Sequence, residues 1–137
     1  MINRSIFKAY DVRGLYPQEV NEEAIRAIGQ ALAEILPEGE VVIAHDGRHG
    51  CPTLANTISE EIVTTGSKLN KNFNTIFVGL ATTPMYYFLV NHFRAVGGAM
   101  ITASHNPKEY NGVKPVRAGA IRVSSEELLA YLDKHGL

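Results

Sequence analysis

Ser104 is followed directly by a histidine, His105, and ten residues later by a lysine, Lys114. A serine hydroxyl can carry a phosphoryl group, while backbone N–H groups and an ammonium stabilise the charge on the transferring oxygens. The same segment contains Asn106 and Pro107, and clusters of this composition commonly build a turn. The residue types alone therefore leave two hypotheses, a phosphate-handling loop and a plain turn.

The elements that must position this loop alternate between helix and strand. Apolar residues at helical spacing behind Asn21 predict a helix over residues 21–36. Further helices are expected after Pro52, behind an N-cap at Thr83 with Pro84 as the first helical residue, and behind the capping box of Ser124 and Glu127. Short β-branched runs predict strands at residues 40–46, 75–79 and 98–102. Residues 112–123 are expected to add a strand at the sheet edge, where an antiparallel orientation is open to it.

This order predicts an α/β fold, namely a three-layer α/β/α sandwich with a mostly parallel, mixed sheet of four strands. Ligands bind beyond the carboxyl ends of such strands. We therefore expect the functional loops to meet at that rim.

The bulk composition narrows the function classes. A chain of 137 residues fits a single domain, residues 1–137, and its net charge of -1 argues against a nucleic-acid or membrane-surface partner. Cys51 is the only cysteine, which excludes an intrachain disulfide and a paired thiolate metal site. No apolar run approaches the length of a membrane span, so a soluble, cytoplasmic protein is expected.

Four segments together resemble one family. Residues 101–107 with 111–114 are similar to the phosphoserine loop of the α-D-phosphohexomutases, the phosphomannomutase/phosphoglucomutase family. Residues 7–14, 45–48 and 82–84 agree with further motifs of that family in order and spacing. The chain thus resembles the N-terminal domain, domain I, of these enzymes.

The resemblance implies an isomerase that interconverts hexose 1- and 6-phosphates. Ser104 matches the phosphoserine, which gives its phosphate to the hexose phosphate substrate and takes back the other phosphate of a hexose 1,6-bisphosphate intermediate and activator. One oxygen of the Ser104 phosphate would ligate Mg²⁺, which holds the phosphoryl group in line with the attacking oxygen.

The resemblance also implies roles for the neighbouring residues. His105 would shuttle a proton, Lys114 would act as an acid/base or electrostatic group, and Tyr10 and Arg13 would form an active-site pair. Without the motif, these side chains would be expected on a solvated surface. The loops that carry them are expected to converge with Arg48 and Ser104 on one rim.

Three residues are expected to support the substrate or its phosphate. They are Arg48, Asn106 and Asn111. An equally open alternative for Arg48 is a structural ion pair with Asp46.

The sequence departs from the family pattern at several points. His45 and Ala44 stand where an arginine and a glycine are usual, and His45 is expected near the rim with fewer anion contacts than an arginine's fixed fork would make. Pro115 removes a backbone donor and is expected to shorten a strand. The family's domains II–IV, which bring the acidic metal loop, are not found in the sequence.

The missing domains leave two main hypotheses, and a third is set beside them. One is the catalytic-loop domain of a larger mutase, inactive alone and able to self-associate through an exposed face. The other is a stand-alone, non-catalytic or regulatory phosphosugar-binding module. A weaker third is an unrelated anion-binding α/β domain.

Overall fold

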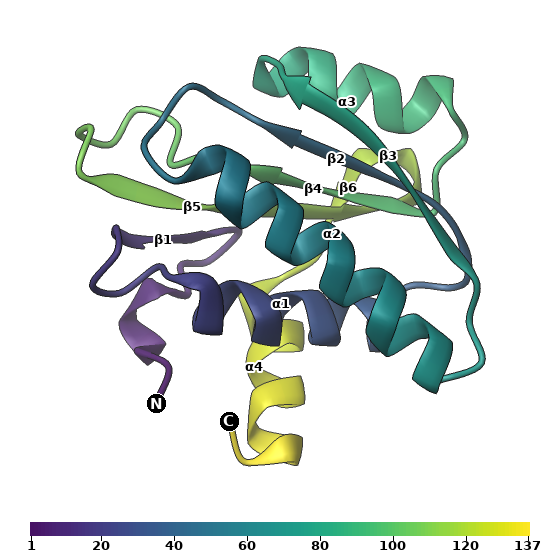
Figure 1. The fold of residues 1–137 in the computed structure, drawn as a ribbon, viewed down its shortest axis with the longest axis horizontal. Helices are drawn as coiled ribbons and strands as arrows, with labels where there is room; N and C mark the ends of the chain where they lie inside the picture. The colour runs from purple at the N-terminus through teal and green to yellow at the C-terminus, as the bar shows by residue number, and fades with distance from the viewer.

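The computed structural model describes residues 1–137 and contains six strands, four α-helices and two short 3₁₀ helices (Figure 1). The strands are β1 (Val12–Leu15), β2 (Gly39–His45), β3 (Phe73–Leu80), β4 (Gly97–Ile101), β5 (Tyr110–Arg117) and β6 (Ile121–Arg122). The helices are η1 (Arg4–Ile6), α1 (Glu22–Ile35), α2 (Cys51–Lys68), α3 (Thr83–His92), η2 (Ala118–Ala120) and α4 (Ser125–His135). None of these helices has the length and apolarity needed to cross a membrane.

The strands form one mixed sheet in the order β1-β5-β4-β2-β3, and β6 also pairs with β5. Strands β3, β2 and β4 are parallel, while β5 runs antiparallel to β4, β1 and β6. The expected α/β class and mixed sheet are confirmed. The expected count of four strands was wrong, because β1 and β6 both pair with β5 and so make it an inner strand rather than an edge.

Helices cover both faces of the sheet, as the three-layer prediction required. Along β2, Val41 and Ile43 pack into the core beneath α1, α2 and α4, whereas Val42 and Ala44 pack on the opposite face against α3. This alternation follows from the two-residue period of a strand. Figure 1 shows α1, α2 and α4 on one side of the sheet and α3 on the other.

Side-chain caps fix where the helices begin. Asn21 accepts a hydrogen bond from the Ala24 N–H at 3.0 Å, and Ser124 with Glu127 forms the predicted capping box. The cap of α3 is Thr82, which accepts from the Met85 N–H, and not Thr83 as the sequence suggested. Thr83 and Pro84 both lie inside the first turn, where a missing N–H costs no intrahelical bond.

Strand β5 continues through Pro115 and reaches Arg117, so the expected shortening was wrong. The Pro115 carbonyl accepts from the Val123 N–H, on the side away from β4. Both polar groups of a residue in an antiparallel strand point to the same side, so the missing proline donor leaves the β4–β5 ladder intact. Close pairing with β1 also requires Gly112, since a Cβ there would overlap the Val12 carbonyl oxygen.

Candidate active site

The loop between β4 and β5 holds Ser104 in an unusual backbone conformation. Its φ of 54° lies in the left-handed region, which is costly for a residue with a side chain. Its N–H donates to Thr102 Oγ1 at 3.0 Å, whereas its own Oγ makes no hydrogen bond within the protein. The N–H of the next residue, His105, is also unpartnered. The loop thus presents a free hydroxyl beside a free backbone donor.

Arg48, in the middle of the loop that leads from β2 to α2, binds the main chain of the serine loop. Its Nη1 and Nη2 atoms donate to four main-chain carbonyl oxygens at 2.7 to 3.1 Å, those of Ser104, Asn106, Pro107 and Tyr110. Its Nε lies 3.3 Å from Asp46 Oδ2. A guanidinium has five N–H donors, and all five are occupied here. Arg48 therefore shapes the loop and has no donor left for a ligand.

Asp46 ties the same loop to the end of β2. Its Oδ2 accepts a hydrogen bond from Thr102 Oγ1 at 2.6 Å, and its Oδ1 accepts from the Arg48 N–H at 3.1 Å. The Thr102 hydroxyl in turn accepts from the Ser104 N–H. A chain of three hydrogen-bonded groups thereby links the β2 end to the backbone of the serine.

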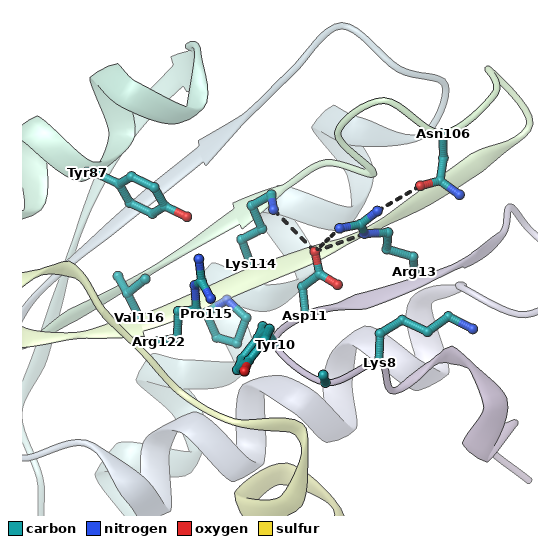
Figure 2. Close-up of a pocket in the computed structure, with 11 residues that line it drawn as sticks. Lys8, Tyr10, Asp11, Arg13, Tyr87, Asn106, Lys114, Pro115, Val116 and Arg122 are labelled. Atoms are coloured by element: carbon teal, nitrogen blue, oxygen red, sulfur yellow. Dashed lines mark hydrogen bonds and ion pairs between the residues drawn. The ribbon is translucent and has the colours of Figure 1, made fainter.

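Asp11 joins the N-terminal segment to the site. Its buried Oδ2 pairs with Arg13 at 2.8 Å and with Lys114 at 3.2 Å, and Arg13 Nη1 donates to Asn106 Oδ1 at 2.9 Å (Figure 2). One carboxylate thus holds two cations. Because Lys114 has three ammonium donors and spends one on Asp11, it keeps two for a ligand.

Two open cavities meet at Lys114. The first, of about 530 Å³, is lined by Ser104, His105, Lys114 and Asp46 together with the start of α3. We call it the serine cavity. The second, of about 430 Å³, is lined by Tyr10, Asp11, Arg13, Asn106 and Lys114 among others, and we call it the tyrosine pocket (Figure 2).

Of the other predicted residues, Asn111 and His45 lie outside both cavities. Asn111 is fully buried beneath the loop, where its amide donates to the His49 carbonyl at 2.9 Å and accepts from the Gly112 N–H. The His45 ring lies 6.3 Å from the Phe77 ring at a tilt of 58°, and its Nδ1 lies 2.7 Å from the Asp46 carbonyl oxygen. Tyr10 is exposed in the tyrosine pocket.

Cys51 lies beneath the same loop as Asn111. Its thiol is buried beside Asp46 and Asn111, and burial raises its pKa to about 11. A thiol with that pKa stays protonated near neutral pH, so Cys51 is not a nucleophile here.

Sequence reasoning passed over Asp11, Thr102 and Arg122, and it considered Asp46 only as an ion-pair partner of Arg48, a pair that the structure contains. Asp11 and Thr102 lie inside the motif segments, and a carboxylate two residues before Arg13 was an available signal. Arg122 lies in no motif, and only the fold brings it to Tyr10, with its guanidinium 4.7 Å from the ring centre.

Nowhere in the chain do three or more histidine, cysteine, aspartate or glutamate side chains come together in a way that could hold a metal ion. The residues of this chain therefore do not form a magnesium site by themselves. Mg²⁺ commonly binds through one or two carboxylates plus substrate phosphates, and Asp46 is the only carboxylate lining the serine cavity.

Comparisons with known proteins agree with this geometry. Residues 4–132 match the family model of phosphoglucomutase/phosphomannomutase, alpha/beta/alpha domain I. A relative from Xanthomonas campestris pv. campestris, described as phosphohexose mutases, is 45% identical over 88% of this chain, which spans 25% of that protein. A Klebsiella pneumoniae phosphomannomutase is 35% identical over 98% of this chain, which spans 82% of it.

A solved structure shows the same fold. The crystal structure of a phosphoglucomutase/phosphomannomutase family protein from Burkholderia thailandensis superposes with a TM-score of 0.84 and 31% identity, over 98% of this chain and 31% of that one. The present chain thus spans about a quarter to a third of these longer proteins. The sequence motifs, the sheet order and the family match lead to one conclusion: the chain belongs to the phosphoglucomutase/phosphomannomutase family and corresponds to its α/β/α domain I.

Proposed function

We propose that residues 1–137 are the phosphoserine domain of a phosphohexomutase and that Ser104 carries the exchanged phosphoryl group. The observation that supports this most directly is the serine cavity. Ser104 Oγ is free of protein hydrogen bonds there, and the cavity is shared with the His105 imidazole and the Lys114 ammonium. These groups are a carrier oxygen, a proton acceptor and a cation in one cavity.

The proposed reaction starts from phosphorylated Ser104 and a hexose 1- or 6-phosphate. The free sugar hydroxyl oxygen forms a bond to phosphorus while the bond from phosphorus to Ser104 Oγ breaks. His105 accepts the proton that leaves the sugar hydroxyl, since imidazole exchanges protons near neutral pH. As its bond to phosphorus breaks, Ser104 Oγ takes up a proton from the Lys114 ammonium, which lines the same cavity. The products of this half are a hexose 1,6-bisphosphate and a serine hydroxyl. Transfer of the other phosphate to Ser104 Oγ, with both proton movements reversed, completes the isomerisation.

Two features of the chain would stabilise the negative charge on the phosphoryl oxygens during this transfer. The His105 N–H is unpartnered and Lys114 keeps two spare donors, and both residues line the cavity that contains Ser104. Preorganised donors of this kind stabilise developing charge because they need no reorientation during the reaction. Arg48 contributes by fixing the loop, and Arg13 contributes through Asn106 and Asp11.

Magnesium, which the family resemblance implies, would draw charge from the phosphoryl group. From this chain it would take a phosphate oxygen on Ser104, and its other ligands would come from outside residues 1–137. We propose that those ligands and the walls that enclose the sugar belong to further domains of a longer mutase. The isolated chain is then expected to fold and to show little or no turnover.

Two measurements test the proposal. Incubation with glucose 1,6-bisphosphate, followed by intact-mass and peptide analysis, should place one added phosphate on Ser104 and none on Ser104→Ala. Phosphate on Ser124 or Ser125 with an unmodified Ser104 would refute the assignment. A coupled mutase assay with glucose or mannose 1-phosphate, bisphosphate and Mg²⁺ should show little turnover, and rates like those of a full-length mutase would overturn the single-domain role.

A further inference from the structure

The tyrosine pocket contains two cations that no carboxylate neutralises, Lys8 and Arg122, and only Arg122 also lacks a hydrogen bond from its side chain. Of its four cationic side chains, Arg13 and Lys114 share Asp11, and Lys8 donates to the Ser5 carbonyl at 2.6 Å. Arg122 lies over the Tyr10 ring at 4.7 Å and makes no hydrogen bond or ion pair. Stacking occupies only the face of a guanidinium, so its N–H edges stay available.

A second donor points into the same space. The Tyr87 hydroxyl lines the pocket from α3 and has no hydrogen-bond partner, unlike the Tyr86 hydroxyl, which donates to the Lys114 carbonyl at 2.9 Å. Figure 2 shows the Tyr87 hydroxyl and the Arg122 guanidinium directed toward the same part of the pocket, beside the Lys114 ammonium. Donors from α3, β5 and β6 therefore lie around the same space, and none of the three hydrogen-bonds to another.

The charge of the pocket favours a dianion. Four cations and a single carboxylate line it, so it carries excess positive charge even after Asp11 is counted. A planar guanidinium with free edges matches the oxygens of a phosphomonoester, and a tyrosine hydroxyl adds a neutral donor. The volume of about 430 Å³ exceeds what one phosphate needs and leaves space for an attached sugar.

We propose that Arg122 and Tyr87, with Lys114, form a second phosphate-binding subsite for a sugar phosphate on this domain, separate from the serine that exchanges phosphate. The choice of a sugar phosphate as ligand rests on the proposed function. The existence of an anion subsite rests on the pocket alone. Since Lys114 lines both cavities, a bisphosphorylated sugar could contact Lys114 from either one. Such a subsite would retain the intermediate on the domain while its two phosphates exchange places.

The test is a titration of the ¹⁵N-labelled chain with glucose 1-phosphate, inorganic phosphate and glucose, followed by amide shifts. Both phosphates should move the amides of Tyr10, Tyr87 and Arg122, and glucose should not. Arg122→Gln should weaken glucose 1-phosphate binding about tenfold or more, since the hydrogen bond that it removes joins two charged groups. Tyr87→Phe should weaken it severalfold, and Arg122→Lys should fall between wild type and Arg122→Gln.

Two controls separate the outcomes. Arg26→Gln, which removes a surface cation on α1 far from the pocket, should bind as wild type does, and Ser104→Ala should keep the shifts at Arg122 and Tyr87. Absence of phosphate on Ser104 in the mass experiment would defeat the proposed function without changing these shifts. Unchanged affinity in Arg122→Gln, equal shifts with glucose, or binding of inorganic phosphate without glucose 1-phosphate would each overturn the subsite.

Discussion

Arg48 Nη2 donates a hydrogen bond to the carbonyl oxygen of Ser104 at 2.7 Å, from a loop 56 residues earlier in the chain. The serine loop is therefore held through its carbonyl oxygens, and the Ser104 hydroxyl and the His105 N–H remain without a protein partner. The position of the Ser104 hydroxyl depends on a residue that does not line the serine cavity.

Replacing Arg48 should both distort the serine loop and lower the free energy of unfolding. Arg48→Met removes the side-chain donors of four carbonyl oxygens and the cation paired with Asp46. We expect a loss of about 2–4 kcal/mol in the free energy of unfolding, with slower phosphorylation of Ser104. Urea denaturation and the mass assay measure the two effects. Arg26→Met is the control, because Arg26 is 48% exposed, its two pairs are long at 3.6 Å, and its less exposed partner Glu61 keeps hydrogen bonds from Gln30 and Thr65. These pairs should contribute under about 0.5 kcal/mol. Equal losses in both variants would contradict the role assigned to Arg48.

The left-handed backbone at residue 104 should lower the stability of the fold whenever the residue there has a side chain. At a φ of 54°, glycine avoids the strain that any side chain causes, so Ser104→Gly should be more stable than Ser104→Ala by about 0.5–1 kcal/mol. Neither variant can accept phosphate. Thermal denaturation of the pair gives the comparison, and a more stable alanine variant would show that the loop relaxes out of the left-handed region.

Asp11 should contribute more to the free energy of unfolding than an exposed aspartate does. Asp11→Asn leaves the Arg13 and Lys114 cations facing each other across a buried position, and we expect a loss of about 2–3 kcal/mol. Asp133→Asn is the matched control, since Asp133 is 71% exposed in its pair with Arg4 and should contribute under about 0.5 kcal/mol. Chemical denaturation of both variants at neutral pH measures the two losses in the free energy of unfolding.

Acid should weaken the start of α4. In the folded state the hydrogen bond from Arg117 lowers the pKa of Glu127 below the ordinary value of a glutamate, against the opposing effect of burial. A depressed pKa stabilises the fold above the unfolded pKa, and this stability is lost as the pH falls through the folded pKa.

Glu127→Gln should therefore reduce the acid sensitivity of unfolding, while glutamine still completes the capping box. Unfolding free energies between about pH 6 and pH 3 test this. The exposed Glu126→Gln serves as control and should leave the slope unchanged. An unaltered slope in Glu127→Gln would show that Arg117 does not stabilise the carboxylate.

The parts of the fold that sequence predicted are those with local signals. Asn21 and the Ser124 capping box mark helix starts through their own side chains, and β2 is a continuous apolar run because it is covered on both faces. Strand β1 has no such signal. Its four residues include Gly14 and Arg13, and they become a strand only because β5 supplies the partner.

The site shows the same division. Ser104, His105 and Lys114 belong to one local segment, so their neighbourhood could be predicted. The donors of Arg48 are consumed by carbonyl oxygens 56 to 62 residues away, a relationship that no spacing rule encodes. The meeting of Arg122 with Tyr10 likewise depends on β6 returning beside β5.

The left-handed backbone at Ser104 also has an evolutionary consequence. Folding alone favours glycine or asparagine at such a position, so a serine there is maintained against the preference of the backbone. A related chain released from phosphoryl transfer would drift toward those residues at this position while keeping Arg48 and its carbonyl partners. The identity of this one residue would then distinguish working mutase domains from relatives that retain only the scaffold.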